Sequence, residues 1–125
     1  MQTLEFQLPL PPSLNNCYRN VKINLRIMTP EARNWKLAAQ ALAMLAMKKQ
    51  GWKKTEKEKV VVEQKFFWPD ARKRDCSNCE KILSDSLNGI VFDDDCWLLN
   101  RVMDFEIDRE NPRVELKIYR KENGA

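Results

Sequence analysis

The sequence predicts one small α/β domain of the α+β kind, with one mixed β-sheet, two main helices and the chain order β-α-β-α-β-β. The length of 125 residues suits a single domain over residues 1–125 and allows a buried core. A hydrophobic fraction of 43% beside 32% charged residues is ordinary for a globular protein. Segments with the two-residue period of strands alternate with two segments that carry helix start signals.

The first predicted strand covers residues 3–8, where Leu4, Phe6 and Leu8 alternate with polar residues. Three prolines at positions 9–12 end it, because proline cannot donate a hydrogen bond to a neighbouring strand. Residues 13–26 are rich in asparagine and basic side chains, so we expect them to form an extended loop.

A long helix is predicted to begin after Thr29, which can cap it, with Pro30 in its first turn, and to end near Gln50 before Gly51. Its apolar residues recur at helical spacing: Trp35, Ala38, Ala39, Leu42, Leu45 and Ala46. Three further apolar residues widen that surface: Leu37, Ala41 and Met44. Two interpretations stay open: a helix packed by its own sheet and by a second subunit, or a single thick core helix.

Residues 60–67 are rich in β-branched and aromatic side chains, and they predict a central or near-central strand. Ser77 and Glu80 then match a capping box, so a second helix is expected to begin there. We expect it to run to Asn88, with Gly89 as its C-terminal cap.

Residues 90–92 are apolar and are expected to return the chain to the core. Two last strands are predicted at residues 96–107 and 113–119. The short polar segment 108–112 predicts that they are joined as a hairpin.

The charge is divided unevenly along the chain. Residues 48–74 hold ten Lys and Arg against four Asp and Glu, a net charge of +6, whereas residues 75–110 hold three against ten, a net charge of −7. A basic block suits phosphates and an acidic block suits metal ions, although two solvated faces of opposite sign would look the same. The chain has no histidine, which excludes Ser-His, Cys-His and His-metal chemistry.

Four cysteines leave two interpretations: Cys17, Cys76, Cys79 and Cys96. The Cys76-x-x-Cys79 spacing would suit zinc or a redox pair, but zinc needs two more ligands and the other cysteines are isolated. Reduced thiols are favoured. Residues 1–10 read as a strand rather than a signal peptide, and the apolar run 37–47 is too short to span a bilayer. We therefore expect a cytoplasmic protein with no membrane partner.

Residues 72–95 carry the strongest functional signal. They open with a basic cluster and close with a run of carboxylates: Arg72, Lys73 and Arg74, then Asp93, Asp94 and Asp95. This pattern predicts a divalent-metal site that faces a nucleic-acid backbone.

The residues Arg74-Asp75-x-Ser77-Asn78-x-x-Lys81, followed by Asp93-Asp94, resemble the signature of the RusA family of Holliday-junction resolvases. The family pattern is Arg-Asp-x-Asp-Asn-x-x-Lys, a helix of about a dozen residues, and an Asp-Asp pair. The opening loop, with Pro11-Pro12-Ser13-x-Asn15 and Tyr18-Arg19, is similar as well, as is the helix start at residues 29–35. The resemblance covers nearly the whole chain.

The resemblance implies a homodimeric endodeoxyribonuclease of bacterial or phage origin that nicks a four-way or branched DNA junction symmetrically in recombination and repair, using Mg²⁺ or Mn²⁺. Asp75 matches the first metal-binding aspartate, Asp94 the aspartate of the distal pair, and Lys81 the essential lysine. These three are the candidate catalytic residues, and the candidate metal ligands are Asp75, Asp94, Asp93 and Ser77. No small-molecule substrate is implied.

One position departs from the family pattern, because Ser77 stands where the second aspartate is expected. A neutral hydroxyl is a weaker ligand than a carboxylate for a hard cation. Either Asp75 and Asp94 with a neighbour still hold the metal, or the chain is a non-catalytic junction-binding protein with a weakened site. Retained cleavage is favoured.

In the active reading, metal-activated water replaces the missing histidine, and Lys81 contacts the scissile phosphate. The candidate DNA-binding residues combine basic, amide and aromatic side chains: Arg72, Lys73, Arg74, Lys81, Asn78, Asn15, Tyr18 and Arg19.

Overall fold

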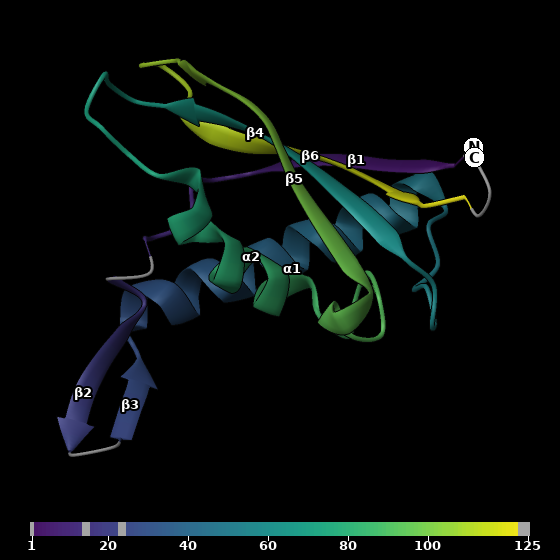
Figure 1. The fold of residues 1–125 in the computed structure, drawn as a ribbon, viewed down its shortest axis with the longest axis horizontal. Helices are drawn as coiled ribbons and strands as arrows, with labels where there is room; N and C mark the ends of the chain where they lie inside the picture. Colours follow the sequence, from purple (N-terminus) through teal and green to yellow (C-terminus); the bar gives the residue numbers. More distant parts are fainter. Residues whose placement is uncertain (1, 14–15, 23–24, 123–125) are drawn as a thin grey trace.

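The computed structural model describes residues 2–13, 16–22 and 25–122. A four-stranded mixed sheet carries two helices on one face, and a separate two-stranded ribbon projects from one end (Figure 1). The strands are β1 (Thr3–Leu8), β2 (Tyr18–Lys22), β3 (Leu25–Met28), β4 (Val60–Trp68), β5 (Leu98–Ile107) and β6 (Arg113–Arg120). The helices are α1 (Pro30–Gln50) and α2 (Glu80–Leu87), with 3-10 turns η2 (Cys76–Cys79) and η3 (Asp95–Trp97). The predicted α+β class, with one mixed sheet and two main helices, is confirmed.

The main sheet has the strand order β1-β6-β4-β5. β6 is antiparallel to both β1 and β4, whereas β4 and β5 are parallel. β4 is therefore central, as predicted, but the predicted β5–β6 hairpin is wrong, because β4 lies between these two strands. Burial explains the arrangement: Val114, Leu116 and Ile118 of β6 are at most 3% exposed, so β6 takes an inner place.

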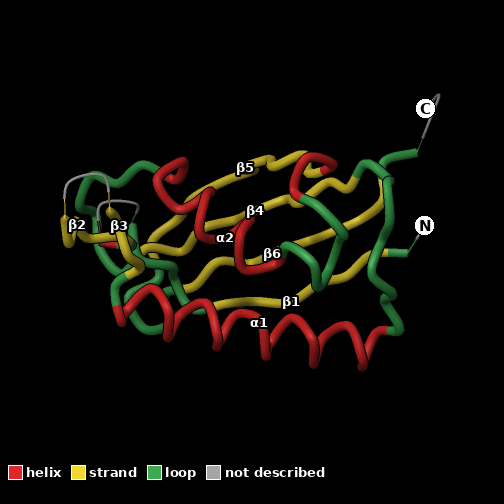
Figure 2. Tube along the Cα trace, turned by 90° about the horizontal axis from the view of Figure 1, so that it is seen from below, coloured by secondary structure: helices red, strands yellow, loops and turns green. Residues whose placement is uncertain are grey.

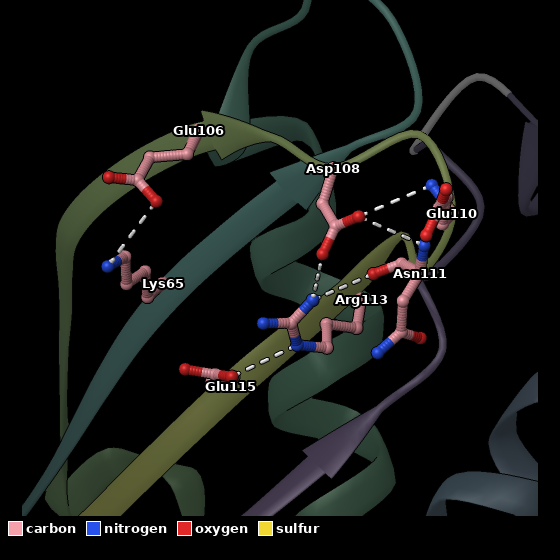
Figure 3. A network of polar contacts seen from close by, with 7 residues as sticks. All are labelled: Lys65, Glu106, Asp108, Glu110, Asn111, Arg113 and Glu115. Carbon is pink, nitrogen blue, oxygen red and sulfur yellow. Dashed lines mark hydrogen bonds and ion pairs between the residues drawn. The ribbon is translucent and has the colours of Figure 1, made fainter.

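The segment between β5 and β6 crosses the end of β4, where the backbone N–H of Asp108 donates to the carbonyl of Trp68 (2.8 Å). The Asp108 carboxylate accepts from Arg113 Nη1 (2.8 Å), and Arg113 Nε donates to Glu115 (3.0 Å) (Figure 3). The same carboxylate accepts from the N–H of Asn111, which closes the turn. This network replaces the expected hairpin with a short crossover.

The core lies between the sheet and the two helices. β4 supplies Val60, Val62 and Phe66 to it, and each of these side chains is fully buried. Burial on both faces of β4 follows from its run of β-branched and aromatic residues. Residues 90–92 return to this core as predicted, with Val91 and Phe92 fully buried.

Helix α1 begins and ends where the sequence predicted. Thr29 Oγ1 accepts from the N–H of Ala32 (3.2 Å), and Gly51 adopts the left-handed conformation with φ of 70°. The face turned to the sheet consists of Ala32, Trp35, Ala39, Ala43 and Ala46. Small alanines let α1 lie close beside β1 (Figure 2).

Leu42 and Leu45, which recur at the same helical spacing, do not join this face, since they are 39% and 49% exposed. Leu37 and Met44 are exposed too, at 65% and 52%. Within the described chain, α1 is therefore packed on one side, and its outer side is apolar and open.

Residues 18–22 and 25–28 contradict the predicted extended loop, because β2 and β3 pair as an antiparallel ribbon. The ribbon is attached to the start of α1 through the N–H of Thr29, which donates to the carbonyl of Cys17 (2.8 Å). Strand pairing satisfies backbone hydrogen-bonding groups that an extended loop would have left unpaired.

The segment between β4 and β5 contains two 3-10 turns beside the single helix that was predicted. The capping box of Ser77 and Glu80 is wrong: Asp75 caps the η2 turn, and α2 begins at Glu80 without a side-chain cap. α2 ends at Leu87, and β5 begins at Leu98 after the η3 turn. None of the helices in the described part of the chain is long and apolar enough to cross a membrane.

Candidate active site

A groove of about 930 Å³ lies between the end of β4, the η2 turn and the start of the chain. Its walls combine apolar side chains from two strands with a polar rim from the segment that leaves β4. The polar rim consists of Arg72, Lys73, Arg74, Asp75 and Asn78. Five of the predicted site residues therefore lie around one groove.

Asp75 is exposed at the N-terminus of η2. Its Oδ1 accepts from the Ser77 hydroxyl (2.8 Å) and from the Ser77 N–H (3.0 Å). These two hydrogen bonds, the hydroxyl first, lower the pKa of Asp75 below its usual value of 3.8. The carboxylate is therefore ionised at neutral pH.

Arg74 is held by its own neighbours rather than directed outward. Its Nη1 donates to the Asp70 carboxylate (2.7 Å), and its guanidinium lies 5.4 Å from the centre of the Trp68 ring. The hydrogen bond from Arg74 lowers the pKa of Asp70 to about 2. Asp70 also accepts from the N–H of Arg72 (2.9 Å), so Arg74 and Asp70 shape the turn, while the Arg72 and Lys73 side chains are exposed.

Lys81 lies in the first turn of α2, with its Nζ 4.9 Å from the centre of the Tyr18 ring. Arg26 approaches the same ring at 5.5 Å. The structure thus brings together two predicted site residues, Lys81 and Tyr18, from opposite parts of the sequence. The aromatic face attracts the cations and holds the β2–β3 ribbon beside α2.

The three aspartates at positions 93–95 have separate surroundings. Asp93 is half-buried, and its Oδ2 accepts from the N–H of Lys57 (3.0 Å), which stabilises the segment before β4. Asp94 caps η3 by accepting from the N–H of Cys96 (3.1 Å). This backbone hydrogen bond, with a smaller contribution from Asp95, lowers the pKa of Asp94, and the hydrogen bond with Asp94 in turn raises the pKa of Asp95.

The η2 and η3 turns lie at opposite ends of α2 (Figures 1 and 2). Asp75 precedes one turn and Asp94 the other, with an eight-residue helix of about 12 Å between them. Within the described ranges, no three His, Cys, Asp or Glu side chains come close enough together to hold a metal ion. The ligand set Asp75, Asp93, Asp94 and Ser77 thus stays a prediction.

A second hollow of about 550 Å³ lies between α2 and the start of β5. Its lining is mostly polar and includes three carboxylates: Ser77, Glu80, Lys81, Ser84, Asp85, Asp95, Leu98 and Asn100. Sequence reasoning missed Asp85 and Asn100. The i, i+4 spacing of Lys81 and Asp85 could have placed Asp85 on that face, but only the fold brings Asn100 there, where its amide donates to Ser84 Oγ (3.0 Å).

The remaining predicted residues are Arg19 and Asn15, from the predicted loop, and the cysteines of the Cys76-x-x-Cys79 motif. Arg19 is exposed on β2. Asn15 lies outside the described residues. Cys79 is buried, and burial raises the pKa of its thiol to about 12, so it stays protonated at neutral pH.

Comparison with known proteins identifies the family of the chain. The family model described as Endodeoxyribonuclease RusA matches residues 9–119, which is most of the chain. A search of curated proteins found no match. The match spans the groove, the η2 turn, α2 and the acidic segment as one unit. The chain therefore belongs to the RusA family of endodeoxyribonucleases, which implies a nuclease that resolves Holliday junctions.

Proposed function

We propose that this protein resolves four-way DNA junctions as a homodimer, by divalent-metal-dependent hydrolysis that makes paired, symmetric nicks. The observation that carries the proposal is the groove in which the ionised Asp75 lies beside the exposed cations Arg72 and Lys73. Cations that attract phosphates, next to a carboxylate able to hold a cation, form the pair of groups that phosphodiester hydrolysis requires.

The donor set fits a metal ion that keeps much of its water. Asp75 uses Oδ1 for both hydrogen bonds from Ser77, so among the described residues its Oδ2 accepts no hydrogen bond and can bind a cation. Mg²⁺ is commonly bound through only one or two carboxylates and retains several water molecules. When bound, such an ion would supply activated water and neutralise charge on the phosphate.

The chain's own residues then position the DNA. Arg72 and Lys73 contact phosphates without reading sequence, and the Asp70–Arg74 pair keeps their turn in place. Lys81, exposed at the start of α2, contacts the phosphate that is cut and stabilises its developing charge. The missing histidine leaves no imidazole for proton transfer, so the proton goes to water or carboxylate.

The test is a nicking assay on a synthetic, immobile four-way junction with Mg²⁺ or Mn²⁺. We expect paired nicks that fall by at least about 100-fold in Asp75→Asn and in Asp94→Asn. Glu110→Gln, an exposed carboxyl change in the turn before β6, is the matched control and should cut normally. Tight junction binding without cleavage in either metal would overturn the catalytic proposal and favour a junction-binding protein with a weakened site.

A further inference from the structure

The two edge strands of the main sheet, β1 and β5, differ in whether their outer backbone groups find hydrogen-bond partners. At the β1 edge, the Gln50 side chain accepts from the Glu5 N–H (2.9 Å) and donates to the Glu5 carbonyl (2.6 Å). The end of α1 thus satisfies backbone groups that an edge strand would otherwise leave open. At the other edge, β5 pairs only with β4 among the described residues, and its outer backbone groups have no neighbouring strand.

The open β5 edge is long and apolar. All seven residues from Arg101 to Ile107 are exposed. They include four large apolar side chains that are 46–64% exposed: Val102, Met103, Phe105 and Ile107. A long, exposed, apolar edge strand is a template for pairing with another strand. Monomeric proteins usually protect such an edge, and the other edge of this sheet shows that protection.

A bulge in β5 determines which side chains share a face. Gln64 of β4 lies opposite Val102, but the next residue, Lys65, lies opposite Asp104, so Met103 is an extra residue. Before the bulge, even-numbered residues of β5 face the helices, as Asn100 does through its bond to Ser84. After the bulge, odd-numbered residues such as Phe105 take that face, and Phe105 lines the groove beside Val102.

We propose that β5 pairs antiparallel with β5 of a second copy of this chain, about a two-fold axis between Val102 and Met103. The two four-stranded sheets then form one sheet of eight strands. The bulge makes this register consistent, because each residue meets a residue of the same face: Leu98 meets Ile107, Asn100 meets Phe105, and Arg101 meets Asp104.

Charge complementarity supports this register. Among the described residues, neither Arg101 nor Asp104 forms an ion pair. Across the two-fold axis Arg101 of each copy lies opposite Asp104 of the other, so two ion pairs form at once. Opposite charges on directly opposed strand positions stabilise an antiparallel pair. Shifting the register by two residues would place Arg101 opposite Glu106, which already pairs with Lys65 (3.7 Å).

The pairing also arranges the candidate active sites. Val102 and Phe105 line the same groove as Asp75, so the groove of each copy lies beside the two-fold axis. Both grooves then open on the helix-bearing face of the joined sheet. This inference deepens the homodimer of the proposed function by naming its interface, and it explains how one dimer presents two grooves to a two-fold symmetric substrate.

The test uses two charge-reversed variants, Arg101→Asp and Asp104→Arg, whose mass is measured by light scattering without DNA or metal. We expect wild-type protein to have twice the 14.8 kDa chain mass at micromolar concentration. Each variant alone opposes like charges twice and should raise the dimer dissociation constant by at least about tenfold. An equimolar mixture should recover the dimer mass, because each variant then meets its opposite charge.

The mixture is its own control for changes inside each chain, since these are the same before and after mixing. Leu37→Lys, on the exposed outer side of α1, should remain dimeric. A variant mixture that stays monomeric would overturn the proposal. If the dimer mass is recovered only when Arg101→Asp is mixed with Glu106→Arg, the proposed register is wrong. If the Leu37→Lys variant is monomeric, the interface lies on α1 instead. A dimer that cuts no junction would overturn the proposed function alone.

Discussion

At the scale of single residues, Ser77 replaces the aspartate of the family pattern and acts on its neighbour. Its hydroxyl donates to the Asp75 carboxylate at 2.8 Å. An aspartate in its place could not donate this hydrogen bond when ionised, and it would set a second negative charge beside Asp75. Serine therefore stabilises the ionised Asp75 by hydrogen bonding. The site has one carboxylate fewer to bind a cation as a result.

We expect Ser77→Ala to raise the pKa of Asp75 toward its ordinary value of 3.8, because the largest cause of the lowered pKa is the hydroxyl. The hydrogen bond stabilises the fold above that ordinary pKa, and the contribution is lost as pH falls through the lower folded pKa. A carboxyl NMR titration measures the shift. Ser77→Thr keeps a hydroxyl and is the control, and an unchanged pKa in the alanine variant would contradict the assignment.

Ser77→Asp should raise the affinity for Mg²⁺ or Mn²⁺ by about tenfold, because a carboxylate is a stronger ligand for a hard cation. Without metal the same variant should unfold at a lower temperature than wild type, since two carboxylates then repel each other. Calorimetric metal titration and thermal unfolding measure the two effects, with Ser77→Asn as the neutral control. Equal metal affinity in all three proteins would show that position 77 lies outside the metal site.

At the scale of elements, the start of α1 connects three parts of the chain. Thr29 caps the helix through Ala32, its hydroxyl donates to the Asn16 carbonyl (2.8 Å), and its N–H donates to Cys17. The β2–β3 ribbon begins beside Thr29, and the ring of Tyr18 in β2 contacts the ammonium group of Lys81 on α2. A single threonine thus fixes both the long helix and the ribbon beside the candidate site.

We expect Thr29→Ala to reduce the free energy of unfolding by about 1–2 kcal/mol, the usual cost of removing an N-terminal cap. Thr29→Ser keeps the hydroxyl and should lose only a few tenths of a kcal/mol. Urea denaturation measures both variants. Equal stability of the alanine and wild-type proteins would contradict the capping role.

At the scale of the whole molecule, the charge separation seen in the sequence becomes a spatial one. The basic residues 72–74 border the groove at one end of α2, whereas the carboxylates of Glu80, Asp85 and Asp95 line the second hollow, between α2 and the start of β5. Phosphate contacts release counterions, so binding to a junction should weaken as salt rises.

Replacing both Arg72 and Lys73 by alanine should reduce the slope of log affinity against log salt by about 2, since each phosphate contact contributes about 0.9. Fluorescence anisotropy with a labelled junction, in Ca²⁺ or without metal, measures the slope. Lys48→Ala with Lys49→Ala removes two charges from the far end of α1 and should leave the slope unchanged. Equal slopes in the two double variants would contradict a specific basic groove.

Much of the candidate site was predictable because its residues are close in sequence. Arg72, Lys73, Arg74 and Asp75 follow one another, so any fold that ends β4 at Trp68 presents them together. Asn100 was not predictable, because it reaches α2 only through the pairing of β5 with β4. The exposure of Leu42 and Leu45 was not predictable either, because helical periodicity alone does not say which apolar side of α1 meets the sheet.

The sequence by itself determined the strand segments of the main sheet, the bounds of α1 and the family, because caps, periodicity and motif spacing are local properties of the chain. The tertiary structure decided the order of the strands, with β6 between β1 and β4 rather than beside β5. It also decided that Asp75 and Asp94 lie at opposite ends of α2 and that β5 is left as an open edge. These features depend on which apolar faces are buried against each other, and burial is a property of the packed chain as a whole.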